Sequence, residues 1–157
     1  MPAKSRSGTS SVVSAYAFWD TSAIVPLCCH QPQSAEARRA ARMYGWQIVW
    51  WATPLEAVSS LERLSREGAL STRERAQAFA KLTYLRERWN EIQPVEEVRD
   101  LAERLLRSHR LRAADALQLA AALVWCSSQP RGRPFIGADD RLADAAEIEG
   151  FRVLRLP

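Results

Sequence analysis

The sequence contains only two histidines and three cysteines among 157 residues. The cysteines are odd in number, and the adjacent pair Cys28 and Cys29 lacks the spacing of a zinc knuckle or of a CxxC redox site. His30 and His109 add too little to build a closed zinc centre, which needs four suitable ligands. This composition argues against the common zinc folds and favours a reduced, cytoplasmic setting.

Long apolar runs are also missing. No uninterrupted stretch approaches the roughly 20 residues of a membrane span, and the apolar run at residues 15–19 ends at once in Asp20. We therefore expect no membrane association. Residues 1–14 have neither a signal-peptide core nor a period that could bury a face. We interpret them as a flexible tail and residues 15–157 as one domain.

Lysine is scarce, so nearly all the positive charge is carried by arginine. Twenty-two basic residues against eighteen acidic ones give a net charge of +4 and a pI near 9.3. The planar donor fork of arginine suits phosphate oxygens. Many arginines, however, lie one helical turn from a glutamate, as Arg66 does from Glu62, and would then form solvated faces. The charge permits a polyanionic partner without requiring one.

Short β-rich runs alternate with helical periods, which predicts an α/β domain with a parallel sheet. The expected strands cover residues 15–19, 47–50, 92–95, 134–138 and 151–156. The expected helices cover residues 36–43, 54–67, 71–89, 98–105, 113–125 and 140–147. Gly68 is a stop signal, and Ser71 with Glu74 is a helix start signal, so two of these helices should form an antiparallel hairpin.

Three acids stand where strands end or helices begin. Asp20 closes the first strand in WDTSA, and Asp139 closes the fourth in FIGADDRL. Either one could simply cap the next helix. Glu56 follows Thr53 by three residues, and with Pro54 as the first helical residue this pair would complete a capping box. Taken singly, each of these acids has a structural explanation.

Asp115 is harder to explain as a structural residue. It lies in LRAADALQLAAAL, a helix so apolar that it should be buried and that only Asp115 and Gln118 interrupt. An ionised carboxylate is expensive to bury without a partner. Arg112, three residues back, could pair with it, but we favour a functional role.

Together the four acids indicate a metal site, because the carboxyl ends of parallel strands meet at one edge of the sheet. Four converging carboxylates would repel each other and raise their own pKa values unless a cation neutralised them. Oxygen ligands select Mg²⁺ or Mn²⁺. Such a metal lowers the pKa of a bound water and stabilises charge on a phosphate, which predicts phosphodiester hydrolysis. Thr21 and Ser22 could support the carboxylates or cap the backbone.

In order and spacing these motifs resemble the PIN domain, namely DTSA at 20–23, TPLE at 53–56, RAADALQLAAA at 112–122 and IGADDRLADAA at 136–146. The hairpin turn LSREGALS and the closing strand GFRVLRL look most like VapC toxins of type II toxin–antitoxin modules. The resemblance implies a three-layer sandwich with a central, mostly parallel sheet flanked by helices. It places the four acids of the family on Asp20, Glu56, Asp115 and Asp139, with Asp140 in the neighbouring position.

By resemblance, such toxins are Mg²⁺-dependent endoribonucleases, often acting on tRNA or rRNA. A VapB-type antitoxin holds them inactive, and a homodimer is expected. The tryptophans at 46, 50, 51 and 89 could serve these interfaces or pack in the core. The chain departs from the family at Gly137, where Thr or Ser is frequent.

Two other functions remain open. The first is a non-catalytic PIN-like nucleic-acid-binding module, which the sequence disfavours because such proteins tend to lose one or more of the four acids. The second is phosphotransfer with Asp20 as nucleophile. Haloacid-dehalogenase chemistry would need a second Asp two residues later, where this chain has Ser22.

Overall fold

The structure, a computed structural model, describes residues 15–157, so the predicted tail at residues 1–14 lies outside the described residues. The strands are β1 (Tyr16–Trp19), β2 (Trp46–Trp50), β3 (Trp89–Ile92), β4 (Pro134–Gly137) and β5 (Arg152–Arg155). The helices are α1 (Thr21–Cys28), α2 (Ser34–Met43), α3 (Thr53–Arg66), α4 (Thr72–Arg86), α5 (Glu96–Ser108), α6 (Ala113–Trp125) and α7 (Asp140–Glu149).

The five strands form one sheet in the order β3-β2-β1-β4-β5, and every pair is parallel. The predicted α/β class is confirmed, and the sheet is parallel throughout rather than mostly so. The chain builds outward from β1 in one direction through β2 and β3, and in the other through β4 and β5. The order therefore reverses at β1, and in open parallel sheets ligands bind beyond the strand ends at such a reversal.

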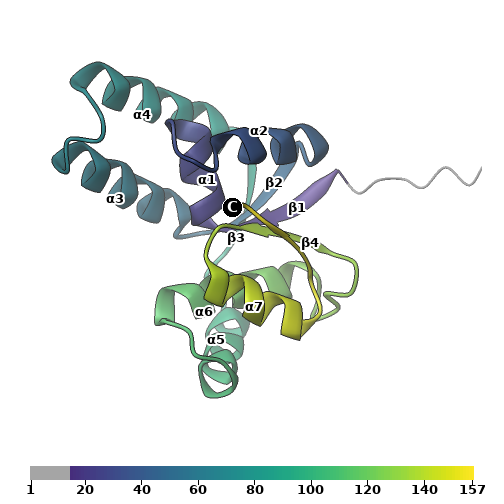
Figure 1. Ribbon diagram of the computed structural model, residues 1–157. Helices are drawn as coiled ribbons and strands as arrows, with labels where there is room; N and C mark the ends of the chain where they lie inside the picture. Colours follow the sequence, from purple (N-terminus) through teal and green to yellow (C-terminus); the bar gives the residue numbers. More distant parts are fainter. Residues whose placement is uncertain (1–14) are drawn as a thin grey trace, which may run out of the picture.

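Helices cover both faces of the sheet and make a three-layer sandwich (Figure 1). Helices α1 to α4 pack on one face, and α5 to α7 pack on the other. The central strand serves both layers, because successive side chains of a strand point to opposite faces. Ala17 and Trp19 belong to the core beneath α1 to α4, whereas Phe18 stacks on Phe135 in the core beneath α5 to α7.

The helical hairpin predicted around Gly68 is confirmed, with α3 and α4 side by side (Figure 1). At the start of α4 both bonds of the capping box are present. The Ser71 hydroxyl accepts from the Glu74 amide at 3.1 Å, and the Glu74 carboxylate accepts from the Ser71 amide at 2.8 Å. The hairpin projects away from the sheet (Figure 1).

One helix was missed and one strand was misplaced. Helix α1 was not among the expected helices; after Thr21 and Ser22 its sequence TSAIVPLC is apolar, and it contains Pro26, which normally interrupts helices. Strand β3 lies three residues before the predicted 92–95, since α4 ends at Arg86 instead of residue 89. Its Trp89 indole N–H donates to Gln47 Oε1 at 2.6 Å, whereas Pro94 has no N–H for a ladder.

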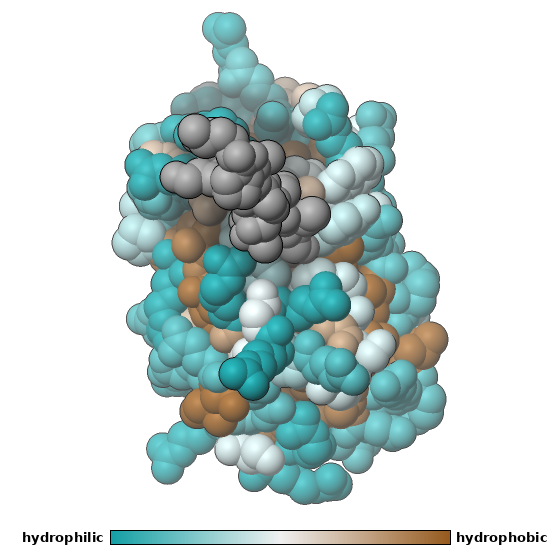
Figure 2. Space-filling model, turned by 90° about the vertical axis from the view of Figure 1, so that its right-hand side faces the viewer, coloured by the Kyte–Doolittle hydropathy of each residue, from teal (hydrophilic) through white to brown (hydrophobic). Residues whose placement is uncertain are grey.

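The tryptophans divide between core and surface. Trp50 is buried and Trp89 is partly buried, which confirms packing for both. Trp46 and Trp51 are each about half exposed, at 50% and 51%. Figure 2 shows one face of the molecule, which is mostly hydrophilic with hydrophobic residues in separate small areas. No helix within residues 15–157 is both long and apolar enough to cross a membrane.

Helix α3 should depend on Leu61 for its position over the sheet. Leu61 is fully buried, whereas Leu55 on the same helix is 70% exposed. We expect Leu61→Ala to lower the free energy of unfolding by about 2 to 5 kcal/mol, because it leaves a cavity in the core. Leu55→Ala should change it by less than about 0.5 kcal/mol. Urea denaturation measures both, and equal effects would contradict this account of the core.

Candidate active site

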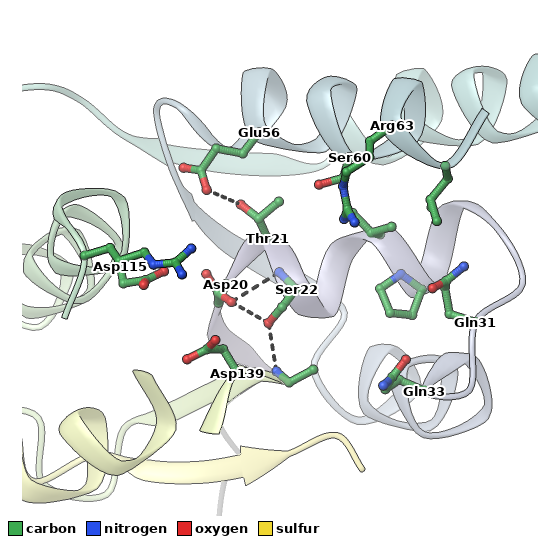
Figure 3. A pocket seen from close by; sticks show the side chains of 15 residues that line it. Asp20, Thr21, Ser22, Gln31, Gln33, Glu56, Ser60, Arg63, Asp115 and Asp139 are labelled. Carbon is green, nitrogen blue, oxygen red and sulfur yellow. Dashed lines mark hydrogen bonds between the residues drawn. The ribbon is translucent and has the colours of Figure 1, made fainter. Parts of the chain in front are cut away.

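A cleft of about 510 Å³ opens beyond the carboxyl ends of β1 and β4, at the reversal of strand order. All four predicted acids line it, from four separate segments of the chain. Figure 3 shows Asp20 in the middle, with Glu56, Asp115 and Asp139 around it. The structure therefore brings the four predicted acids to one cleft.

Asp20 is fixed most firmly. It follows β1 directly, is only 5% exposed, and caps α1 by accepting from the Ser22 amide at 3.2 Å. The Ser22 hydroxyl also donates to the same carboxylate oxygen and accepts from the Ala138 amide at 2.8 Å. Ser22 thus ties the end of β1 to the segment after β4. The capping and the functional interpretations of Asp20 are compatible, because one carboxylate offers about four acceptor positions.

Glu56 does not close the predicted capping box. Helix α3 starts at Thr53 itself, after Ala52, and no side chain caps it. The Glu56 carboxylate instead accepts from the Thr21 hydroxyl at 3.3 Å through Oε2, and from the Gln118 amide at 3.3 Å through Oε1. The structural explanation of Glu56 was therefore wrong, because its partners come from α1 and α6 and not from its own helix.

Asp115 and Asp139 form the other side of the cleft. Asp115 is half-buried in the first turn of α6. Asp139 is exposed and caps α7, accepting from the Leu142 amide at 2.8 Å. Within the described residues, no ion pair joins Asp115 to Arg112, so the pairing considered from the sequence is not formed. Arg112 nevertheless lowers the pKa of Asp115, as Arg141 does to a smaller extent.

Burial and mutual repulsion raise the pKa values of three of these acids. Burial raises the pKa of Asp20 to about 6, and the charge of Asp115 adds to the rise. Burial also raises the pKa of Glu56 to about 7, helped by the charge of Asp20. The pKa of Asp115 is raised by burial and then by Asp139. Groups with pKa values shifted in this way gather at functional sites.

The side chains fit a hard divalent cation. The cleft offers carboxylate and hydroxyl oxygens, the ligands that Mg²⁺ and Mn²⁺ prefer, and a cation would offset both the burial and the repulsion that raise these pKa values. Within residues 15–157, no three His, Cys, Asp or Glu side chains already form a group that could hold a metal ion. The four acids therefore line the same cleft, but their side chains are not arranged as a ready set of metal ligands.

Asp140 does not line the cleft that holds the four acids. It lines an adjoining hollow of about 560 Å³, which it shares with Asp115, Asp139 and Arg141. Its side chain is 93% exposed and faces Arg155 at 3.7 Å. The two neighbouring aspartates thus differ, because Asp139 lines both the cleft and the hollow, whereas Asp140 lines the hollow alone.

Several residues of the site were not expected from the sequence. Arg63 and Arg112 are exposed and line the cleft beside the acids, which gives it both signs of charge. Gln118 and Thr53 are buried behind Glu56. Gln118 did leave a signal, since it is the one polar residue besides Asp115 in the apolar stretch of α6 and stands three residues after it, on the same helix face.

The pKa shift of Asp20 predicts a pH dependence of stability in the metal-free protein. The pKa of Asp20 is about 6 in the folded protein, against an ordinary value of 3.8. The folded protein therefore loses stability relative to the unfolded chain as the pH rises from 4 to 8 and Asp20 ionises. On raising the pH over this range, Asp20→Asn should gain about 2 to 3 kcal/mol of stability relative to the wild type. Urea denaturation in EDTA measures this gain. Asp100→Asn, at an exposed acid of α5, is the control, and an equal gain there would refute the assignment.

A comparison with known protein families identifies the family of the chain. Its sequence matches the PIN domain over residues 17–148, a span that contains all four acids. A comparison with curated proteins gives no match. PIN domains are generally nucleases and typically depend on a divalent metal. The match, the three-layer parallel fold and the acidic cleft agree, and the chain belongs to the PIN-domain family.

Proposed function

We propose that the chain is a divalent-metal-dependent endoribonuclease of the VapC type, the toxin of a type II toxin–antitoxin module. One observation carries the catalytic part of this proposal. Four acids from four segments line one cleft, and burial together with their mutual repulsion raises the pKa values of Asp20, Glu56 and Asp115. Helix capping accounts for the position of Asp20 but not for that of Glu56 or Asp115, which cap no helix.

Asp20, Glu56, Asp115 and Asp139 would hold the cation, Mg²⁺ or alternatively Mn²⁺. When bound, it supplies positive charge for the phosphate and makes hydroxide available near neutral pH. Ser22 and Thr21 hold the carboxylates of Asp20 and Glu56 in place. Because these hydroxyls act on the acids, substrate need not contact them.

The cleft also suits a phosphodiester chain. Arg63, Arg112 and Arg141 lie on its rim and on the adjoining hollow, where their guanidinium groups can bind phosphate oxygens. The cleft is open and mostly polar, so a flexible single strand would fit better than a compact metabolite. RNA, with tRNA and rRNA as the first candidates, is the substrate that we infer from the resemblance to VapC toxins.

The proposed role implies two partners. An antitoxin of the VapB type would cover the acidic cleft, and a second copy of the chain would form a homodimer. The half-exposed Trp46 and Trp51 support such protein contacts, because tryptophan is enriched in interface cores.

Cleavage of total cellular RNA by the purified, antitoxin-free protein tests the proposal. With Mg²⁺ or Mn²⁺ we expect discrete fragments, and none with EDTA or with Asp20→Asn purified in the same way. Fragments that persist with Asp20→Asn would come from a contaminant and would remove the support for catalysis. Intact RNA that nevertheless binds the protein would favour the alternative, a non-catalytic PIN-like nucleic-acid-binding module.

The neighbouring aspartates provide a matched pair of variants. Asp139→Asn should reduce the cleavage rate at least roughly 100-fold, since even residues that only support metal ligands contribute 10- to 100-fold. Asp140→Asn should change it by less than about fivefold, because its exposed ion pair with Arg155 contributes little. Initial rates on one defined RNA measure both effects. Equal losses of rate in the two variants would contradict the assignment of Asp139, and not Asp140, to the active site.

A further inference from the structure

Gln118 lies behind the cleft and not in its lining. It belongs to α6, is 1% exposed, and is surrounded along the helix by the apolar Leu117, Leu119 and Ala120. Apolar side chains would satisfy packing at such a position, and a buried amide is costly unless it makes hydrogen bonds. The reason for an amide here must therefore be sought in its contacts.

Two of the three hydrogen bonds of Gln118 lead to Glu56. The Gln118 amide nitrogen lies 2.8 Å from the Thr21 hydroxyl, 3.3 Å from the Thr53 hydroxyl and 3.3 Å from Glu56 Oε1, and it donates to these oxygens. Thr21 in turn donates to Glu56 Oε2 at 3.3 Å. Gln118 thus contacts one carboxylate oxygen directly and the other through Thr21.

The other end of the amide makes no such contact. Within the described residues, Gln118 Oε1 is buried and has no hydrogen-bond partner. Leaving a buried acceptor unsatisfied is unfavourable, so the acceptor gives no reason for glutamine at this position. The donor end alone has partners. One is the Thr53 hydroxyl, and the other two, Glu56 itself and Thr21, place the donor on the Glu56 carboxylate directly and through one hydroxyl.

We propose that Gln118 is a positioning residue that holds both oxygens of the Glu56 carboxylate in the orientation in which this acid faces the cleft. The inference rests on the proposed function, in which Glu56 is a cation ligand. Gln118 does not touch cation or substrate. It acts through Glu56, as the hydrogen-bonding partners of metal ligands generally do.

Gln118→Met tests this, because methionine has a similar shape but no N–H. In EDTA, crystal structures of the wild type and the variant should differ in the Glu56 side chain, which loses its orientation in the variant. By calorimetry, Mn²⁺ affinity should fall roughly 10- to 100-fold. The kcat for RNA should fall similarly with little change in KM, since Gln118 lies outside the cleft. Gln118→His, which keeps an N–H donor, should restore much of both.

Leu119→Met is the matched control, a buried substitution at the next position of α6 that should leave Mn²⁺ affinity and kcat unchanged. Gln118→Leu replaces the methionine variant if the latter does not fold. An unmoved Glu56 with wild-type Mn²⁺ affinity and kcat would overturn the inference and leave the proposed function standing. A wild type that neither binds Mn²⁺ nor cleaves RNA would end the proposed function, and the two metal-free crystal structures would still decide whether Gln118 holds Glu56.

Discussion

The burial of mutually repelling carboxylates at the carboxyl edge of the sheet is the constraint on which the rest of the structure depends. Asp20 is buried at the end of the central strand, where the strand order reverses, and it cannot avoid the other acids by turning into solvent. Its neighbours Glu56, Asp115 and Asp139 reach the same cleft from other segments. The fold thus brings together like charges that would stabilise it more if they were apart.

The scaffold keeps this arrangement in place with bonds that serve two purposes. Asp20 and Asp139 each cap a helix and line the cleft at the same time, so the helix starts also fix the acids. Ser22 links the segments after β1 and β4 by accepting from the Ala138 amide. The two helical layers pack on opposite faces of the sheet, and residues of both layers line the cleft at its carboxyl edge.

Local sequence signals predicted the acids and most of the elements, because caps, strand ends and helical periods depend on neighbouring residues. Helix α6 was predicted at its observed bounds for this reason. The errors came from competing or distant interactions. Helix α1 was missed because Pro26 lies inside it. The capping box suggested by the spacing of Thr53 and Glu56 does not form, because Glu56 accepts hydrogen bonds from Thr21 and Gln118 instead. Gln118 meets its partners Thr53 and Thr21 across 65 and 97 residues, and no local pattern encodes such contacts.

The central claim is that the cleft retains protons near neutral pH which a divalent cation displaces. It is tested most directly by titrating Mn²⁺ into the EDTA-treated and dialysed protein at pH 6.5, by calorimetry in buffers of different ionisation enthalpy. With pKa values of about 6 for Asp20 and about 7 for Glu56, binding should release protons, and the release should fade towards pH 9. Binding without proton release at pH 6.5, or no binding at either pH, would contradict the account.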